Sequence, residues 1–319
     1  MAVYTQVPRN ALEAFLGAFD LGDLEDYEGI TQGVENTNYK IVTAKDRFIL
    51  TLFEQRVDAA DLPFFLDYMR LLSDRGVPAP APMADRRGRI VKPLCGRPAI
   101  IISFLPGAGV DAPTPALCEQ AGAVCARLHE TAADFEKTRR NALDLEGWRA
   151  LAADSAPRAD ECATGLSAMI AAELAFLGDA WPRALPSGVV HADLFPDNVF
   201  FKDGVFSGVI DFYFSCTEFY AYDLAITLCA WAGEGGWSRE KARALSRGYQ
   251  TVRPLSAPER AALPILLRGA ALRFLLTRLH DWLHQVDGAQ VRVKDPLAYR
   301  DLLQFLQSAD LQTLGLNDD

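Results

Sequence analysis

The chain has 319 residues, 50% of them hydrophobic and 23% charged, so it is long enough for two compact regions with separate cores. The net charge of −10 argues against a general nucleic-acid-binding protein but not against a nucleotide held with a metal ion. The six cysteines form no Cys-x-x-Cys pair, no apolar run could span a bilayer, and no signal peptide is recognisable. We therefore expect a reduced, cytoplasmic protein that contacts neither nucleic acid nor membrane.

The first third of the chain predicts one helix and then short strands. Arg9 to Phe19 has helical apolar spacing, whereas Tyr39–Val42 and Phe48–Phe53 are typical of strands joined by a polar turn. Between the predicted helix and the first of these strands, residues 29–38 are rich in Gly, Asn and Thr. A loop of this composition can expose backbone amides to phosphates, although a plain hairpin turn explains this stretch better when it is taken alone.

A second helix, at 61–72, precedes two further predicted strands. These cover Arg89–Pro93 and Pro98–Phe104, and the pattern breaks at Leu105–Gly109. From this point the composition favours helices. We therefore predict two domains: residues 1–106 form a nucleotide-binding lobe, and residues 107–319 form a catalytic and substrate-binding lobe.

The second region predicts a series of helices. The first begins at Thr114-Pro115, a cap residue followed by proline at the first helical position, and runs to His129. The other predicted helices cover Gly165–Leu177, Tyr222–Ala232, Lys241–Tyr249, Pro258–Gln285 and Pro296–Leu314.

The stretch from His191 to Asp211 combines two apolar strands with polar residues at their ends. A short strand leads into His191-Ala-Asp193, and a second strand begins after Asn198. Asp203-Gly204 predicts a hairpin turn, and the return strand ends on Asp211. This hairpin would bring Asp193, Asn198 and Asp211 to one edge of a small sheet.

These three side chains suit phosphoryl transfer, which requires positioning and charge neutralisation around a phosphate. Asp193 could orient the accepting hydroxyl, while Asn198 and Asp211 could hold Mg²⁺ through hard oxygen atoms. An isolated Asp-x4-Asn is usually a turn or a helix cap, but its combination with His191, two apolar strands and a strand-terminal aspartate is much rarer. His191 itself could be a metal ligand, but a role in fixing the loop by hydrogen bonds fits better.

These residues resemble the aminoglycoside phosphotransferase and choline kinase superfamily, and the resemblance runs from near the start of the chain to about Arg300. The resemblance implies an α+β, two-lobed protein-kinase-like fold, with a small antiparallel sheet in the N-terminal lobe and a larger, mainly helical C-terminal lobe. It also implies ATP and Mg²⁺ as cofactors, Asp193 as catalytic carboxylate, Asn198 and Asp211 as metal ligands, and Asp223 as a brace for the catalytic loop. The implied nucleotide-binding residues are Gly29, Gly33, Asn36, Asn38, Thr51, Ser103 and Leu105.

Two positions depart from the pattern of this superfamily. Threonine, Thr51, stands on the third strand where such kinases usually carry a lysine for the α- and β-phosphates. Lys40 and Arg56 are candidates to replace that charge, and Asp61 is a candidate partner acid. In addition, Tyr213 follows Phe212 where a glycine is usual after the metal-binding aspartate.

Longer strings, such as Gly33-Val-Glu-Asn-Thr-Asn38 and Leu272-Arg-Phe-Leu-Leu-Thr-Arg-Leu279, resemble the homoserine kinases of this superfamily. That resemblance implies L-homoserine as the acceptor and a step towards threonine. An amino-acid acceptor needs a cation for its carboxylate. Arg273 lacks a nearby acid in sequence and is our candidate, with Tyr213 as a possible pocket residue, whereas Arg278 has Asp281 as an intrahelical partner.

Two alternatives to this function stay open. One is a related kinase acting on an aminoglycoside, a choline-like alcohol or another hydroxy-amine. The excess of Lys and Arg over Asp and Glu after residue 237, 12 against 9, weakly disfavours a polycation bound there. The other is a non-catalytic nucleotide-binding module, which the absence of the strand-three lysine permits. The sequence leaves the oligomeric state open.

Overall fold

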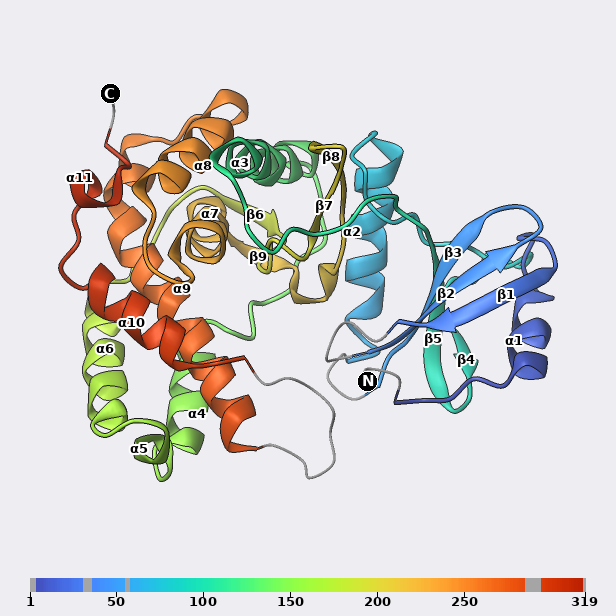
Figure 1. The fold of residues 1–319 in the computed structure, drawn as a ribbon, viewed down its shortest axis with the longest axis horizontal. Coiled ribbons are helices and arrows are strands. Elements are labelled where there is room, and N and C mark those ends of the chain that lie inside the picture. The colour runs from blue at the N-terminus through green and yellow to red at the C-terminus, as the bar shows by residue number, and fades with distance from the viewer. Residues whose placement is uncertain (1–3, 31–35, 55–57, 285–293, 318–319) are drawn as a thin grey trace. The chain divides into compact units, whose positions relative to one another are not determined.

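The computed structural model describes residues 4–30, 36–54, 58–284 and 294–317 (Figure 1). The chain divides into two compact units. The first runs from the start of the described residues to Pro106 and includes the later segment Gly208–Tyr213. The second contains Gly107–Ser207 and the described residues from Phe214 onwards.

A five-stranded antiparallel sheet, in the order β1-β2-β3-β5-β4, forms the first unit (Figure 1). Burial alternates strictly along β2, as expected of a strand with one face on the core. Gly29, the last residue of β1, pairs with Tyr39 of β2. The strands are β1 (Leu24–Gly29), β2 (Thr37–Thr43), β3 (Arg47–Leu52), β4 (Lys92–Leu94) and β5 (Arg97–Ser103).

Two helices complete this unit. Helix α1 (Arg9–Leu16) buries Leu12, Phe15 and Leu16 in one core with the sheet residues Ile41 and Leu50. Helix α2 (Leu62–Asp74) carries proline in its first turn, where the missing amide hydrogen costs no helical hydrogen bond. Its buried face includes aromatic residues that also contact the segment 212–213.

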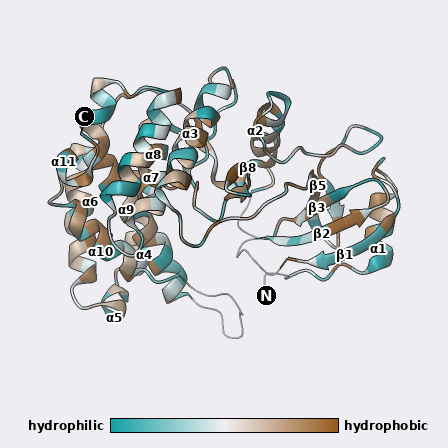
Figure 2. Ribbon diagram, turned by 45° about the horizontal axis from the view of Figure 1, so that its top comes forward, coloured by the Kyte–Doolittle hydropathy of each residue, from teal (hydrophilic) through white to brown (hydrophobic). Residues whose placement is uncertain are grey.

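The second unit is mainly helical. Its helices carry both hydrophobic and hydrophilic residues, as expected of elements with one buried face (Figure 2). Helices α3 and α8 approach most closely at glycines: a Cβ atom on Gly122 would lie 1.9 Å from the Leu245 carbonyl oxygen. The helices are α3 (Pro115–Thr131), α4 (Leu145–Ser155), α5 (Ala159–Cys162), α6 (Leu166–Ala180), α7 (Tyr220–Leu228), α8 (Arg239–Val252), α9 (Ala257–Leu283), α10 (Leu297–Leu306) and α11 (Leu311–Leu314).

Short strands position the polar loop in this unit. Strand β6 (Ser187–Val190) pairs with β9 (Cys216–Phe219), and β7 (Val199–Lys202) pairs with β8 (Val205–Val209). Residues 191–198 connect β6 to β7, and α7 begins directly after β9. Helix α7 continues as one π-helical turn, η2 (Cys229–Gly233), a local widening that is common near functional sites.

The predicted sheet in the first region and the helical remainder are confirmed, with differences at particular elements. The predicted helix Pro296–Leu314 is two helices, because Asp310 caps a new helix by accepting a hydrogen bond from the Thr313 amide. The predicted helix Tyr222–Ala232 begins at Tyr220 and changes to a π-helical turn after Leu228. Strand β9 and helix α4 were not predicted, since neither has a long apolar pattern.

Candidate active site

The loop from His191 to Asn198 holds two of the predicted site residues together. The Asn198 side-chain amide donates to the Asp193 carbonyl oxygen at 2.8 Å and to its carboxylate Oδ2 at 3.2 Å. Because the amide nitrogen makes both bonds, the Asn198 Oδ1 oxygen is the atom available to a cation. The Asp193 amide donates to His191 Nδ1 at 3.3 Å, so this buried histidine acts within the loop.

The backbone at Ala192 is strained and doubly anchored. Its φ of 63° lies in the left-handed region, which a residue with a side chain rarely adopts. Its amide donates to Asp223 Oδ1 at 2.7 Å, and its carbonyl oxygen accepts from the Arg273 guanidinium at 2.7 Å. The second Asp223 oxygen accepts from the His191 amide at 3.2 Å. These bonds from α7 and α9 fix the conformation that presents Asp193.

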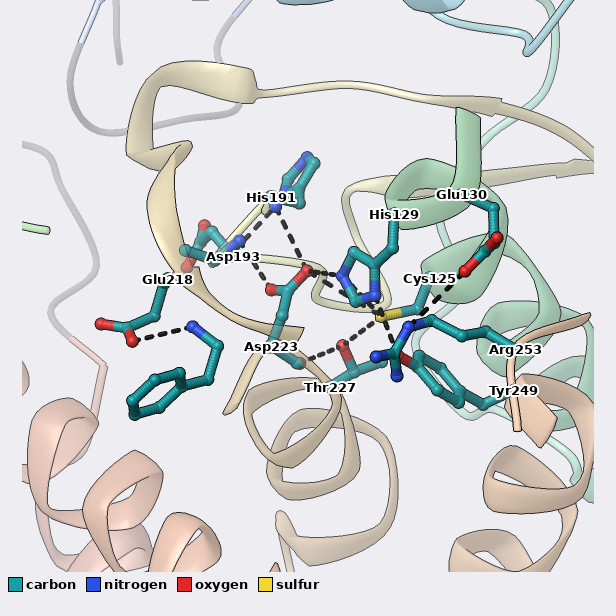
Figure 3. Close-up of polar contacts among 12 residues, drawn as sticks. Cys125, His129, Glu130, His191, Asp193, Glu218, Asp223, Thr227, Tyr249 and Arg253 are labelled. Atoms are coloured by element: carbon teal, nitrogen blue, oxygen red, sulfur yellow. Dashed lines mark hydrogen bonds and ion pairs between the residues drawn. The ribbon is translucent and has the colours of Figure 1, made fainter. Parts of the chain in front are cut away.

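Asp223 is fully buried at the centre of a polar network (Figure 3). Its carboxylate meets His129 Nε2 at 2.9 Å, and His129 Nδ1 meets the Tyr249 hydroxyl at 2.9 Å. Burial acts to raise the pKa of Asp223, but the His129 hydrogen bond and charge, with the loop amides, outweigh it and lower that pKa. Arg253 donates to Tyr249 Oη at 3.1 Å and extends the network to its outer end.

The sequence predicted His129 only as the end of a helix, and its connection to the loop was not predicted. Cys125, one turn before it on α3, lies 3.9 Å from both His129 and Asp223. Burial keeps the pKa of this thiol well above its usual value, so Cys125 is a neutral neighbour. The 2.9 Å between His129 Nε2 and Asp223 Oδ2 is the length of a direct hydrogen bond. Only the spacing of Cys125 and His129 on the apolar face of a helix could have signalled this role.

A tryptophan supports the loop from a third direction. The Trp231 indole nitrogen, in the π-helical turn η2, donates to the Leu194 carbonyl oxygen at 2.8 Å. The residue is 2% exposed. The carbonyl groups of Ala192 and Leu194 are therefore both satisfied by side chains from the helical core.

Arg273 is almost fully buried, at 1% exposure, and it packs between the rings of Phe214 and Phe274. Its guanidinium donates to Ala192, and no described residue accepts from its Nε. This position favours bracing of the catalytic loop over the predicted contact with a substrate carboxylate, which stays a prediction.

Arg278, five residues further along α9, pairs with Glu234 and not with the predicted Asp281. Its Nη1 pairs with Glu234 at 3.0 Å, and its guanidinium lies 4.4 Å from the centre of the Tyr299 ring. Among the described residues, neither Arg278 Nη2 nor the Tyr299 hydroxyl has a hydrogen-bond partner. Burial raises the pKa of Tyr299 well above its usual value, Arg278 opposes the shift, and the charges of Glu234 and Asp193 add to it. The grouping of Arg278, Glu234 and Tyr299 was not predicted from the sequence.

Asp211 follows β8 and belongs to the first unit, with a left-handed φ of 64°. Its convergence with the loop of the second unit therefore stays a prediction. Tyr213, two residues later, packs edge-on against Phe53 and Phe65, with ring centroids 5.1 and 5.9 Å apart. Burial and the charge of Asp211 raise the pKa of Tyr213, and a hydrogen bond with Thr51 opposes this shift.

Thr51, at the place of the usual lysine, is buried and bonded. Its hydroxyl donates to Asn38 Oδ1 at 2.7 Å across the β2–β3 pair. Lys40 is half-exposed and pairs with Glu28 at 2.8 Å. Asp61 is the residue before α2. The other candidate cation, Arg56, lies outside the described residues.

The predicted nucleotide-binding residues are spread over the first unit, with Asn38 on β2 and Thr51 on β3. Gly29 ends β1, and no described residue donates to the buried Asn36 Oδ1. Gly33 lies outside the described residues. Ser103 ends β5, where its amide and hydroxyl both bond to Ala81 at 2.9 Å.

Leu105, the last of the predicted nucleotide-binding residues, is fixed by a close contact in the first unit. It packs so tightly on Gly208 that a Cβ atom there would lie 2.8 Å from Leu105 Cδ1. The predicted nucleotide contacts of these residues stay predictions.

Comparison with known proteins agrees with this geometry. Residues 26–262 match the model of the phosphotransferase enzyme family. The chain belongs to this family. Proteins named homoserine kinase match nearly throughout: that of Xanthobacter autotrophicus is 52% identical, covering 99% of both chains, and that of Azorhizobium caulinodans is 53% identical, covering 96% of both. Within the phosphotransferase family the chain therefore belongs with the homoserine kinases, which confirms the predicted resemblance.

Solved structures of phosphotransferases share the fold. A spectinomycin phosphotransferase, crystallised with ADP and spectinomycin, matches with a TM-score of 0.72 over 95% of this chain and 99% of its own, at 15% identity. A microcompartment-associated aminopropanol kinase matches with a TM-score of 0.70 over 97% and 99%, at 20% identity. The predicted protein-kinase-like fold is confirmed, and membership of the family implies use of ATP with a divalent cation. None of the described helices could cross a membrane.

Proposed function

We propose that the protein transfers the γ-phosphoryl group of ATP to the side-chain hydroxyl of L-homoserine, giving O-phospho-L-homoserine for threonine synthesis. The observation that carries this proposal is the identity of about half of all residues, over nearly the whole chain, with proteins named homoserine kinase. The paired Asp193 and Asn198 support the phosphotransfer chemistry. The reaction draws on cytoplasmic ATP, so we place the protein in the cytoplasm.

In this proposal Asp193 holds the acceptor hydroxyl. Its carboxylate is oriented by the Asn198 amide, and its backbone is fixed through Ala192. As the homoserine oxygen forms its bond to the γ-phosphorus and the bond to the β–γ bridging oxygen breaks, Asp193 accepts the hydroxyl proton. Holding the reacting groups in line is the main contribution of the protein to such a reaction.

Asn198 and Asp211 are the proposed ligands of Mg²⁺. The donor set fits this ion, because both residues offer oxygen atoms and the Asn198 amide nitrogen is already engaged by Asp193. When bound, Mg²⁺ neutralises charge on the phosphates. Since Thr51 carries no charge, this metal pair matters more here than in a kinase with the strand-three lysine. The stretch from Gly29 to Asn38 would cover the phosphates, and residues 103–105 would meet adenine.

We propose Arg278 as the cation that binds the homoserine carboxylate. Its Nη2 and the Tyr299 hydroxyl are buried hydrogen-bond donors that no described residue satisfies, and buried donors normally have partners. Asp193 contributes to the electrostatic environment of Tyr299. Glu234, paired with Arg278, offers an acceptor for the substrate ammonium group. Arg273 then serves the loop, and Tyr213 stays a candidate pocket residue.

A panel assay tests the function. Purified protein with Mg²⁺-ATP is offered L-homoserine, other hydroxy-amino acids, amino alcohols and aminoglycosides, and ADP and phosphorylated product are both quantified. We expect turnover with L-homoserine that far exceeds any other acceptor, and none in Asp193→Asn. Preference for another alcohol would assign the protein to a related kinase, and no turnover with any acceptor would indicate a nucleotide-binding module.

A further inference from the structure

Three side chains with metal-binding atoms converge where α9 ends against α4. His280 and His284 lie one helical turn apart, and both direct Nε2 at one oxygen of Asp154. The Nε2–Oδ2 distances are 3.5 Å for His280 and 3.6 Å for His284. None of these residues takes part in the proposed phosphoryl transfer.

The hydrogen bonding of His284 fixes the state of its ring. Its Nδ1 lies 2.8 Å from the His280 carbonyl oxygen. Because a carbonyl oxygen can only accept, Nδ1 carries the proton, and in neutral His284 the Nε2 atom presents a lone pair. That lone pair faces the Asp154 carboxylate, so the two acceptors require either a second proton on the ring or a cation between them.

His280 has a similar arrangement, although a looser one. Its Nδ1 lies 3.8 Å from a carboxylate oxygen of Asp281, on the opposite side of the ring from Asp154. Histidines that bind metals usually direct the second nitrogen at a carbonyl or carboxylate oxygen, which orients the ring and strengthens the ligand. His284 has such an outer hydrogen-bond partner in the His280 carbonyl oxygen, whereas His280 has only the more distant charge of Asp281.

The distances favour a metal ion over direct hydrogen bonds. Hydrogen bonds from nitrogen to oxygen usually measure about 2.7–3.2 Å. Two ligands of a tetrahedral zinc ion, each about 2.1 Å from the metal, lie roughly 3.4 Å apart. The separations of 3.5 and 3.6 Å match the second value.

We propose that Asp154, His280 and His284 bind a single divalent transition-metal ion of the zinc class, with water as fourth ligand. Nitrogen and carboxylate ligands select such ions over Mg²⁺. The three side chains are 36–55% exposed, which leaves an open coordination position. Since the ligands come from α4 and α9, the bound ion would join the two helices.

Titration of the EDTA-treated, full-length protein with Co²⁺ tests the proposal. We expect one equivalent to bind, with the absorption of a tetrahedral ion and without a thiolate charge-transfer band. Zn²⁺ should displace it and excess Mg²⁺ should not. His280→Ala, His284→Ala and Asp154→Asn should each weaken binding at least about tenfold, and Asp281→Asn less.

Asp179→Asn provides the matched control, because it removes an exposed carboxylate on the neighbouring helix α6, and it should bind Co²⁺ as the unmodified protein does. Circular dichroism verifies that each variant is folded. The proposal is overturned if the unmodified protein takes up no Co²⁺, since the histidines are then imidazolium partners of Asp154. Uptake that persists in all three ligand variants would also overturn it.

Discussion

The catalytic loop and the segment around Asp211 reach the same unusual backbone conformation but are held by different means. Ala192 and Asp211 both have a φ near 63°, in the left-handed region. At Ala192 a buried carboxylate and a buried guanidinium bind the amide and the carbonyl oxygen. After Asp211, the rings of Phe212 and Tyr213 pack against aromatic residues, and Tyr213 forms a hydrogen bond with Thr51.

The difference shows two ways to stabilise strained backbone. Alanine has no special tolerance for a positive φ, so holding it in the left-handed region costs about 1–3 kcal/mol and requires surrounding bonds that define its conformation. Aspartate adopts the left-handed region more readily, so Asp211 requires less support. The residue that is strained at the first site, Ala192, is a neighbour of Asp193, the proposed catalytic residue. At the second site the residue with the positive φ, Asp211, is itself the proposed metal ligand.

The largest expected effect comes from removing the charge of Asp211. Asp211→Asn keeps the size and the backbone tolerance of the residue but weakens its oxygen as a Mg²⁺ ligand. We expect a loss of kcat on the order of a thousandfold, because no lysine at position 51 can compensate on the phosphates. Steady-state kinetics measures the loss, and nucleotide binding is measured separately. Near-normal turnover would contradict the proposed mechanism.

Asp223→Asn breaks the anchor of the catalytic loop. It leaves His129 and two loop amides without their charged acceptor, so we expect a loss of about 3–5 kcal/mol in the free energy of unfolding. Because the folded state lowers the pKa of Asp223, its contribution is present above about pH 4 and is lost as the pH falls through the lowered pKa. The stability difference between the two proteins should therefore shrink on acidification. Chemical denaturation over a pH series measures it.

A difference that stays constant down to pH 2 would show that Asp223 contributes through packing and not through its charge. If Asp223→Asn does not fold, Tyr249→Phe tests the outer part of the same network. It removes the hydroxyl that meets His129 and Arg253, so we expect the free energy of unfolding to fall by about 1 kcal/mol.

The two arginines of α9 should separate kinetically. Arg273→Ala removes the bond to the Ala192 carbonyl oxygen, so we expect kcat to fall roughly tenfold or more with little change in the KM for L-homoserine. Arg278→Ala should instead raise that KM. Arg268→Ala on the same helix is a matched control, because it breaks a buried pair with Glu173 without a bond to the loop. A raised KM in Arg273→Ala alone would restore the prediction made from sequence.

The smallest effect is expected from Tyr213→Phe. The ring contacts with Phe53 and Phe65 are kept, and only the hydrogen bond with Thr51 is lost. We expect a loss of about 1 kcal/mol in the free energy of unfolding and less than a tenfold change in kcat. Thermal unfolding and kinetics measure both. A marked rise in the KM for L-homoserine would show that the hydroxyl lines the acceptor pocket.

The sequence allowed the main elements and the Asp193–Asn198 pair to be predicted, because apolar periodicity and a short local motif specify them. The contacts of Arg273 and Arg278 could not be predicted. Their partners, Ala192 and Glu234, are 81 and 44 residues away, and only tertiary packing decides which arginine turns towards which group. The link from His129 to Asp223 spans 94 residues and was missed for the same reason.

The indole of Trp231 gives the catalytic loop a reporter of its own opening. Its N–H is buried and bonded to the Leu194 carbonyl oxygen, so this proton can exchange with solvent deuterium only when the bond opens. The chain has five tryptophans, so the indole resonances are few enough to assign by substitution. The exchange rate of a single side-chain proton would then measure how often the loop departs from its working conformation, with and without nucleotide.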